Sequence, residues 1–168
     1  SGKEARKMDV FVQYGMVAAK DYFFDNQKRN SFLSRLMNLI PADRGANRES
    51  IVKLMVACRE FTNHGHRSLI IYPEGTRSQT GEMAPMKKGP AMIATELSLP
   101  IVPVYINGTH RAYPKGGKFF KPTRLRVYIG EVIDPNRFRE EHGGGRMIYS
   151  AITREMENRI HKLKELHG

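Results

Sequence analysis

Hydrophobic and polar positions follow two different periods along the chain, and these periods predict alternating strands and helices. Residues 69–72 form a short apolar run, rich in β-branched and aromatic side chains, that stops at Pro73. Such a run predicts a buried strand. Apolar residues within 48–62 recur at helical spacing and predict an amphipathic helix that ends near Gly65. The apolar positions of this helix are Ile51, Leu54, Met55, Cys58 and Phe61.

Other segments extend the strand pattern on both sides. Residues 10–19 predict an early strand in which Gly15 allows a bulge. Residues 100–106 are almost continuously apolar, which is typical of parallel strands covered on both faces. Residues 124–130 alternate and predict a strand with one exposed or ligand-facing side. One face of that strand carries Leu125, Val127 and Ile129, and the other carries Arg124, Arg126 and Tyr128.

Helices are predicted between and after these strands. Asp25 or Asn26 is placed to cap a helix that Pro41 ends. Pro90 at a first helical position starts a helix that runs to about Ser98. A C-terminal helix follows from an apolar stripe at helical spacing. The stripe consists of Ile148, Ile152, Met156, Ile160 and Leu163, and the helix before Pro41 carries Phe32, Leu33, Leu36 and Met37.

This order of elements predicts an α/β fold in which a mainly parallel central sheet is flanked by helices. Residues 107–122 hold two Pro and three Gly and predict a loop. Residues 63–66 contain His64 and His66, but spacing places no third ligand, so we interpret them as a turn and expect no metal. No boundary splits the chain, so residues 1–168 are predicted to form a single domain.

Candidate chemistry gathers directly after the strand of residues 69–72. Glu74 and Arg77 stand three positions apart around Gly75, and Lys87 and Lys88 precede the predicted helix start. Two lysines there repel the positive end of the helix dipole, so the placement favours a bound anion. In parallel sheets ligands bind at the carboxyl ends of strands, where this loop is expected to lie.

Charge and cysteine content narrow the class of partner. The chain has 28 Lys and Arg against 17 Asp and Glu, a net charge of +11, which favours nucleic acid, phosphate-bearing substrates or an anionic membrane surface. Nucleic acid is the least favoured, because no known nucleic-acid-binding signature is present. The single cysteine, Cys58, is interpreted as a buried core thiol. No run approaches the ~20 apolar residues of a membrane-spanning helix, so any membrane contact is expected to be peripheral.

The loop also resembles a known family. Tyr72-Pro73-Glu74-Gly75-Thr76-Arg77-Ser78 is similar, with one conservative change at Tyr72, to the Phe-Pro-Glu-Gly-Thr-Arg-Ser block of the 1-acylglycerol-3-phosphate O-acyltransferases. Residues 99–104 resemble that family's later Pro-rich strand block. Residues 40–44 are similar to a short block ending in Arg near the family's acceptor phosphate. The resemblance covers roughly residues 16–133.

This resemblance implies transfer of an acyl chain from acyl-CoA or acyl carrier protein to the hydroxyl of lysophosphatidic acid or a related glycerophosphate, in phospholipid biosynthesis. The acyl donor is a co-substrate, and no cofactor is implied. An anionic membrane surface on the cytoplasmic side is the expected location. Arg77 and Arg44 are expected on the acceptor phosphate, since a guanidinium meets two oxygens at once. The candidate acceptor-binding residues are Glu74, Gly75, Thr76, Arg77, Arg44, Lys87 and Lys88.

One departure from the family concerns its catalytic His-x-x-x-x-Asp, in which His is the general base. None of the six histidines is followed by Asp at that spacing, so no catalytic residue is assigned. Because the sequence opens with Ser1-Gly2, which resembles a cleavage scar, we interpret it as missing its natural N-terminal part. The alternative hypothesis is a catalytically inactive phosphate- or lipid-binding domain of the same fold.

Overall fold

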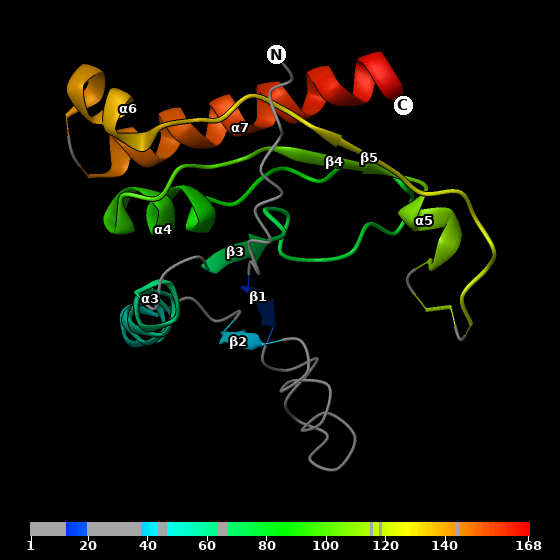
Figure 1. Ribbon diagram of the computed structural model, residues 1–168, viewed down its shortest axis with the longest axis horizontal. Coiled ribbons are helices and arrows are strands. Elements are labelled where there is room, and N and C mark those ends of the chain that lie inside the picture. Colours follow the sequence, from blue (N-terminus) through cyan, green and yellow to red (C-terminus); the bar gives the residue numbers. More distant parts are fainter. Residues whose placement is uncertain are drawn as a thin grey trace, which may run out of the picture. The chain divides into compact units, whose positions relative to one another are not determined.

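The computed structural model of the chain describes residues 13–19, 38–43, 47–63, 67–114, 116–117, 119–143 and 145–168. These residues fall into two compact units, Ser1–Ile71 (unit 1) and Tyr72–Gly168 (unit 2), whose elements are labelled in Figure 1. A single domain over residues 1–168 therefore stays a prediction.

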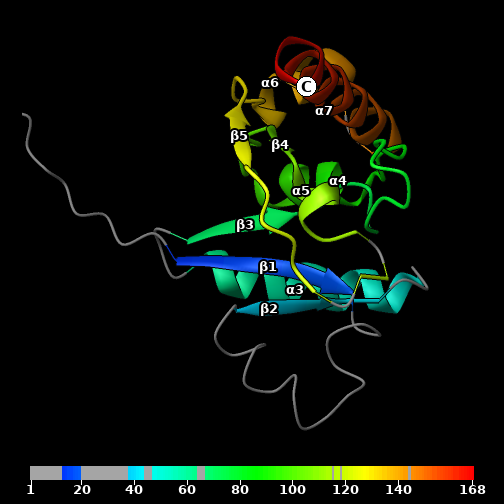
Figure 2. The same ribbon diagram turned by 90° about the vertical axis from the view of Figure 1, so that its right-hand side faces the viewer.

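Unit 1 contains a three-stranded parallel sheet in the order β2-β1-β3. Its strands are β1 (Gln13–Ala19), β2 (Leu39–Ala42) and β3 (Arg67–Ile71). Parallel neighbours need a crossover, and α3 (Arg48–Thr62) provides the one between β2 and β3. This helix packs against both strands and covers one face of the sheet (Figure 2).

The predicted helix over residues 48–62 is confirmed, because α3 has these bounds, a capped N-terminus and a buried apolar side chain. Asn47 is the N-cap, and its Oδ1 accepts a hydrogen bond from the Ser50 N–H at 2.8 Å. Cys58 is fully buried on the inner face of the helix. Burial raises the pKa of its thiol to about 11. The interpretation of Cys58 as a buried core thiol is therefore confirmed.

Gly15 does not form the predicted bulge. It lies opposite Leu69 in an unbroken register between β1 and β3. A Cβ at Gly15 would lie 3.0 Å from a ring carbon of Phe61 and 3.1 Å from Cδ1 of Ile40. Glycine is present here because α3 and β2 approach the strand closely, a cause that the sequence of β1 alone does not reveal.

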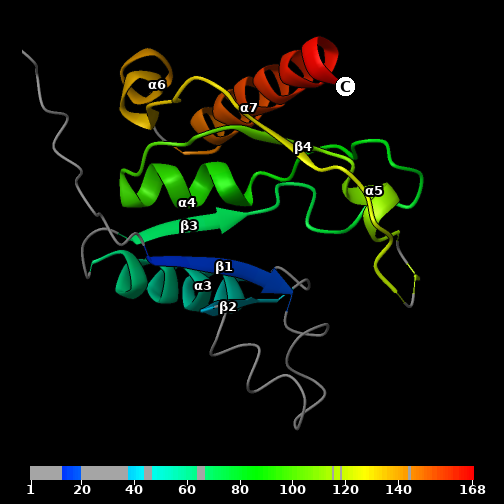
Figure 3. The same ribbon diagram turned by 45° about the vertical axis from the view of Figure 1, so that its right-hand side comes forward.

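Unit 2 is built around a long C-terminal helix. Its elements are α4 (Gly89–Leu97), β4 (Val104–Asn107), α5 (Thr109–Ala112), β5 (Arg126–Ile129), α6 (Pro135–His142) and α7 (Arg146–His167). The helix α7 packs against α4, α6, β4 and β5 (Figure 3). The predicted apolar stripe of α7 is confirmed, since four of its members are buried: Ile148, Ile152, Met156 and Ile160.

Polar side chains hold α4 in place beside this core. Arg139 of α6 donates to the Thr95 carbonyl at 2.7 Å, and the Tyr149 hydroxyl of α7 donates to Glu96 at 2.6 Å. The hydrogen bond to Glu96 raises the pKa of Tyr149. Pro90 lies in the first turn of α4, and Ser98 is its left-handed C-cap, so the predicted bounds of this helix are confirmed.

The strand predicted over residues 100–106 is only partly present, and its expected parallel pairing is wrong. Only β4 forms, and it pairs antiparallel with β5, with Val104 opposite Ile129. Pro100 and Pro103 lack an N–H donor, which prevents a continuous ladder through this segment. The predicted loop over 107–122 also contains the short helix α5.

The alternation predicted for residues 124–130 is present, but the aliphatic face of β5 is not the packed one. Val127 and Ile129 are exposed, whereas the Tyr128 ring stacks on His167 of α7 at 4.2 Å. The α/β class with a parallel sheet flanked by helices is confirmed. The predicted end of a helix at Pro41 is wrong, because Leu39–Ala42 pairs with β1 as the extended strand β2. The rest of that predicted helix, the turn at His64 and His66, and Arg44 lie outside the described residues.

Candidate functional site

The loop after Tyr72 begins with a tight turn that requires glycine. The Gly75 N–H donates to the Tyr72 carbonyl at 3.0 Å, and Gly75 has φ of 67°, in the left-handed region. The loop closes at its far end, where the Lys87 N–H donates to the Pro73 carbonyl at 2.9 Å. Residues 73–87 therefore form a closed loop that leads directly into α4.

Glu74 stabilises the interior of this loop. Its Oε2 accepts a hydrogen bond from the Ala84 N–H at 2.7 Å, and the residue is partly buried. A carboxylate that accepts a backbone N–H within its own loop contributes to shape. The role of Glu74 in binding the acceptor stays a prediction.

Lys87 lies directly over the turn. A Cβ built at Gly75 would lie 3.0 Å from Lys87 Nζ and 3.1 Å from Lys87 Cε. The structure therefore brings together two of the predicted site residues, Gly75 and Lys87. Any side chain at position 75 would displace the lysine, so glycine at this position serves both the turn and the placement of a cation.

The start of α4 carries unbalanced positive charge. Lys88 is its N-cap and makes no side-chain capping hydrogen bond, and the first turn contains no acidic residue. A Cβ built at Gly89 would have no heavy atom within 4 Å. A helix N-terminus next to two exposed lysines is an arrangement that attracts an anion.

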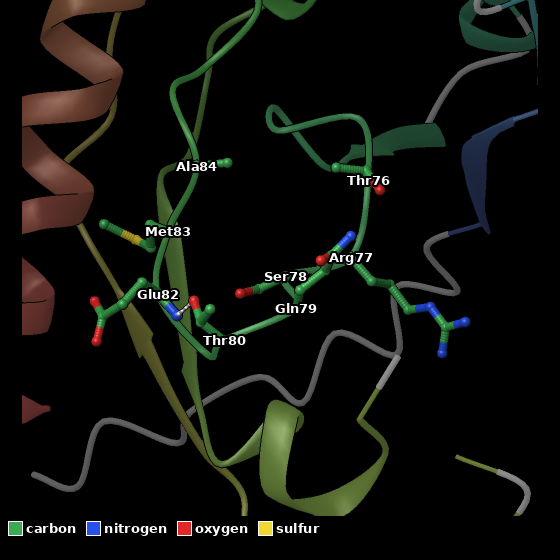
Figure 4. A pocket seen from close by; sticks show the side chains of 8 residues that line it. All are labelled: Thr76, Arg77, Ser78, Gln79, Thr80, Glu82, Met83 and Ala84. Carbon is green, nitrogen blue, oxygen red and sulfur yellow. Dashed lines mark hydrogen bonds between the residues drawn. The ribbon is translucent and has the colours of Figure 1, made fainter. Parts of the chain in front are cut away.

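Arg77 contacts an aromatic ring that the sequence does not indicate as its partner. Its guanidinium carbon lies 5.1 Å from the centroid of the Tyr113 ring, within range of a cation–π interaction. In Figure 4 the Arg77 side chain extends away from Ser78 and Thr80. Tyr113 lies in a Pro- and Gly-rich segment without periodicity, so no sequence signal marks it. The role of Arg77 as a phosphate ligand stays a prediction.

The middle of the loop encloses a shallow depression of about 260 Å³ (Figure 4). Polar side chains fix its backbone, since the Ser78 Oγ accepts from the Gly81 N–H at 2.8 Å and the Thr80 Oγ1 accepts from the Glu82 N–H at 3.3 Å. The residues that line the depression are Thr76, Arg77, Ser78, Gln79, Thr80, Glu82, Met83 and Ala84.

Contacts with α7 hold the loop in place. Glu82 forms an ion pair with Lys164 of α7, and the hydrogen bond between them lowers the pKa of Glu82 and raises that of Lys164. The Met86 N–H donates to Oε1 of Glu157 at 3.2 Å. The candidate site therefore lies on a loop fixed to the longest helix of the unit.

Six of the seven predicted binding residues lie within this loop and the start of α4. They are Glu74, Gly75, Thr76, Arg77, Lys87 and Lys88; the seventh, Arg44, lies outside the described residues. Over the described parts of the chain, no helix is both long enough and apolar enough to cross a membrane.

The fold and the loop together define an α/β protein with a basic loop at a helix start. Residues 6–107, more than half of the chain, match the family model described as Acyltransferase. The chain belongs to this acyltransferase family.

Two relatives are named for a more specific acyltransferase activity. A 1-acyl-sn-glycerol-3-phosphate acyltransferase of Cocos nucifera is 45% identical over 74 residues, which are 44% of this chain and 24% of that protein. One of Saccharomyces cerevisiae is 32% identical over 146 residues, 85% of this chain and 42% of that protein. The chain thus spans less than half the length of these relatives. The resemblance drawn from residues 72–78 is confirmed.

A solved structure has the same fold. The crystal structure of the 1-acyl-sn-glycerophosphate (LPA) acyltransferase PlsC from Thermotoga maritima superposes with a TM-score of 0.61 at 24% sequence identity. The match covers 91% of this chain and 57% of that chain. At this identity the likeness supports the fold.

Proposed function

We propose that the chain belongs to an enzyme that transfers an acyl chain from acyl-CoA or acyl carrier protein to the hydroxyl of lysophosphatidic acid or a related glycerophosphate, in phospholipid biosynthesis. The residues described here supply the side of the site that binds the acceptor phosphate. The observation that carries this proposal is the closed loop of residues 73–87, which places Lys87 over Gly75 at the start of α4.

Lys87, Arg77 and Glu74 have different roles in the proposed binding of the acceptor. Lys87 and the N-terminus of α4 attract the phosphate, since both are positive and the lysine is exposed. Arg77 binds two phosphate oxygens through its planar guanidinium, and its stacking on Tyr113 limits the orientations that the side chain adopts. Glu74 keeps the loop closed through Ala84.

The chemical step needs a general base. In the reaction the acceptor oxygen forms a bond to the thioester carbonyl, its proton goes to the base, and the thiolate leaves when the C–S bond breaks. General-base catalysis of this kind contributes typically ~10²–10⁴-fold. None of the six histidines stands in a His-x-x-x-x-Asp pair. We therefore propose that the base is supplied by residues outside this sequence.

The same absence favours a second candidate function. A domain that keeps the phosphate-binding loop but lacks the base binds glycerophosphates without acyl transfer. Both functions share a peripheral position on the cytoplasmic side of a membrane, where anionic lipids attract a chain of net charge +11.

A thioester-consumption assay distinguishes the two functions. We expect the 168 residues alone to show little or no turnover of acyl-CoA with lysophosphatidic acid. A longer form that carries a His-x-x-x-x-Asp upstream is expected to restore turnover. Robust turnover by the 168 residues contradicts the proposed source of the base, and no turnover by the longer form favours the binding domain.

A further inference from the structure

Two adjacent phenylalanines project from the segment between α5 and β5. Phe119 is 80% exposed and Phe120 is 79% exposed, more than any other large hydrophobic side chain among the described residues. Large apolar side chains exposed together mark an interaction surface more often than single ones do. We refer to Phe119 and Phe120 as the aromatic tip.

The aromatic tip has a fixed backbone beneath it. The Phe120 ring stacks on Tyr113 with centroids 4.4 Å apart, and the Lys121 N–H donates to the Ala112 carbonyl at 2.8 Å. The described residues of this segment extend beyond α5, away from α7 (Figures 1 and 3). The tip is therefore exposed although contacts with Tyr113 and Ala112 hold its segment in place.

The sequence segment that carries the aromatic tip has charge of one sign. From Leu97 to Gly130 the sequence contains no Asp or Glu, while it contains six Lys or Arg residues. Four of the six are described and exposed: Arg111, Lys121, Arg124 and Arg126. Aromatic rings beside basic side chains fit the interface of an anionic bilayer, where rings reach the acyl boundary and cations meet lipid phosphates.

We propose that the aromatic tip is the membrane-inserting element of this chain, and that its occupant is a bilayer containing anionic lipid. Phe119 and Phe120 enter the interface, while Arg111, Lys121 and Arg124 contact lipid phosphates. A second protein is a less suitable occupant, because a basic segment without acidic residues gives little electrostatic specificity beyond attraction to anions.

The aromatic tip is also linked to the proposed acceptor site. Phe120 stacks on Tyr113, and Tyr113 lies under the guanidinium of Arg77. This link rests on the proposed function of Arg77 as a phosphate ligand. Insertion of the tip then holds Arg77 at the lipid surface, so a lysophospholipid is bound from the membrane without transfer of its acyl chain through water.

A single-tryptophan experiment tests the insertion. The sequence has no tryptophan, so Phe119→Trp introduces one reporter. Met147→Trp is the matched control, since Met147 is 73% exposed at the start of α7, beside α6 and at the opposite end of unit 2 from α5 (Figure 1). We expect vesicles with anionic lipid to shift the Phe119→Trp emission to the blue and lipids with brominated acyl chains to quench it. The control emission is expected to stay unchanged.

Cosedimentation with the same vesicles completes the test. Phe119→Ala combined with Phe120→Ala is expected to lower the partition coefficient about tenfold or more, since two apolar rings leave the interface. Met147→Ala is expected to leave it unchanged, and circular dichroism checks the fold of each variant. Binding of the unmodified chain should also weaken at high salt.

Two results overturn the inference. If Phe119→Trp shows no blue shift while cosedimentation shows the protein bound, another surface contacts the membrane, and the proposed acceptor site is unaffected. If the chain does not bind anionic vesicles at all, the tip is not a membrane element. Binding of soluble glycerophosphate is measured without vesicles, so it reports separately on the proposed function.

Discussion

Cys58 of unit 1 shows how burial changes the pKa of a single side chain. Its thiol is fully buried, and its pKa is raised from 9.0 to about 11 by desolvation. A raised pKa means that the folded state favours the neutral thiol. The resulting stabilisation is fully present below pH 9 and is lost as the pH rises toward 11.

This shift predicts a pH-dependent loss of stability. Between pH 8 and pH 10.5 the free energy of unfolding of the parent chain should fall by about 2 kcal/mol more than that of Cys58→Ala. Urea unfolding followed by circular dichroism at both pH values measures the difference. Because Tyr and Lys titrate equally in the two proteins, an identical pH dependence would show that the thiol does not contribute.

The sequence predicts some residues of the candidate site and not others. Lys87, Lys88 and Gly75 follow from the helix start at Pro90 and from the turn, because local rules determine both. Tyr113 does not follow, since its contact with Arg77 joins positions far apart in the chain within an aperiodic segment. Local pattern predicts which groups are present, and packing determines which groups meet.

At the scale of elements, Gly15 shows how a strand depends on its neighbours. The position lies in regular β1 pairing and approaches Phe61 of α3 and Ile40 of β2. A larger side chain there must displace one of these groups. We expect Gly15→Val to destabilise the chain by about 1–3 kcal/mol, the usual cost of overpacking.

Thermal or urea unfolding measures this effect, with Val52→Ala as a control for a substitution on the exposed face of α3. The control is expected to change stability little, as surface substitutions usually do. Gly15→Val with unaltered stability would mean that α3 and β2 do not pack on β1 as closely as described.

Helices with a long periodic pattern were predictable, whereas the short helix α5 and the pairing of β4 were not. The bounds of α3 follow from apolar spacing, and those of α4 from apolar spacing combined with a proline. The helix α5 has only four residues, too few for a period to be visible. The pairing of β4 with β5 depends on two prolines and on a partner strand, so the apolar run of residues 100–106 predicts burial but not direction.

At the scale of the whole molecule, the chain combines the acyltransferase fold with a basic loop and a basic, aromatic surface. The family match, the loop of residues 73–87 and the net charge of +11 all support the proposed anionic acceptor. The part of the proposed phosphate-binding site that the fold positions most directly is Lys87 and the start of α4, which are held beside the turn at Gly75.

Calorimetric titration with sn-glycerol 3-phosphate tests this central claim most directly, because the ligand carries the acceptor phosphate and needs no membrane. The account predicts binding by the parent chain and a loss of roughly 1–3 kcal/mol in Arg77→Lys, which keeps the charge but not the two-pronged geometry. Arg154→Lys, at an exposed arginine of α7, should bind like the parent. If Arg77→Lys and Arg77→Ala stay folded by circular dichroism and bind the ligand as well as the parent does, Arg77 is not a phosphate ligand and the site is assigned wrongly.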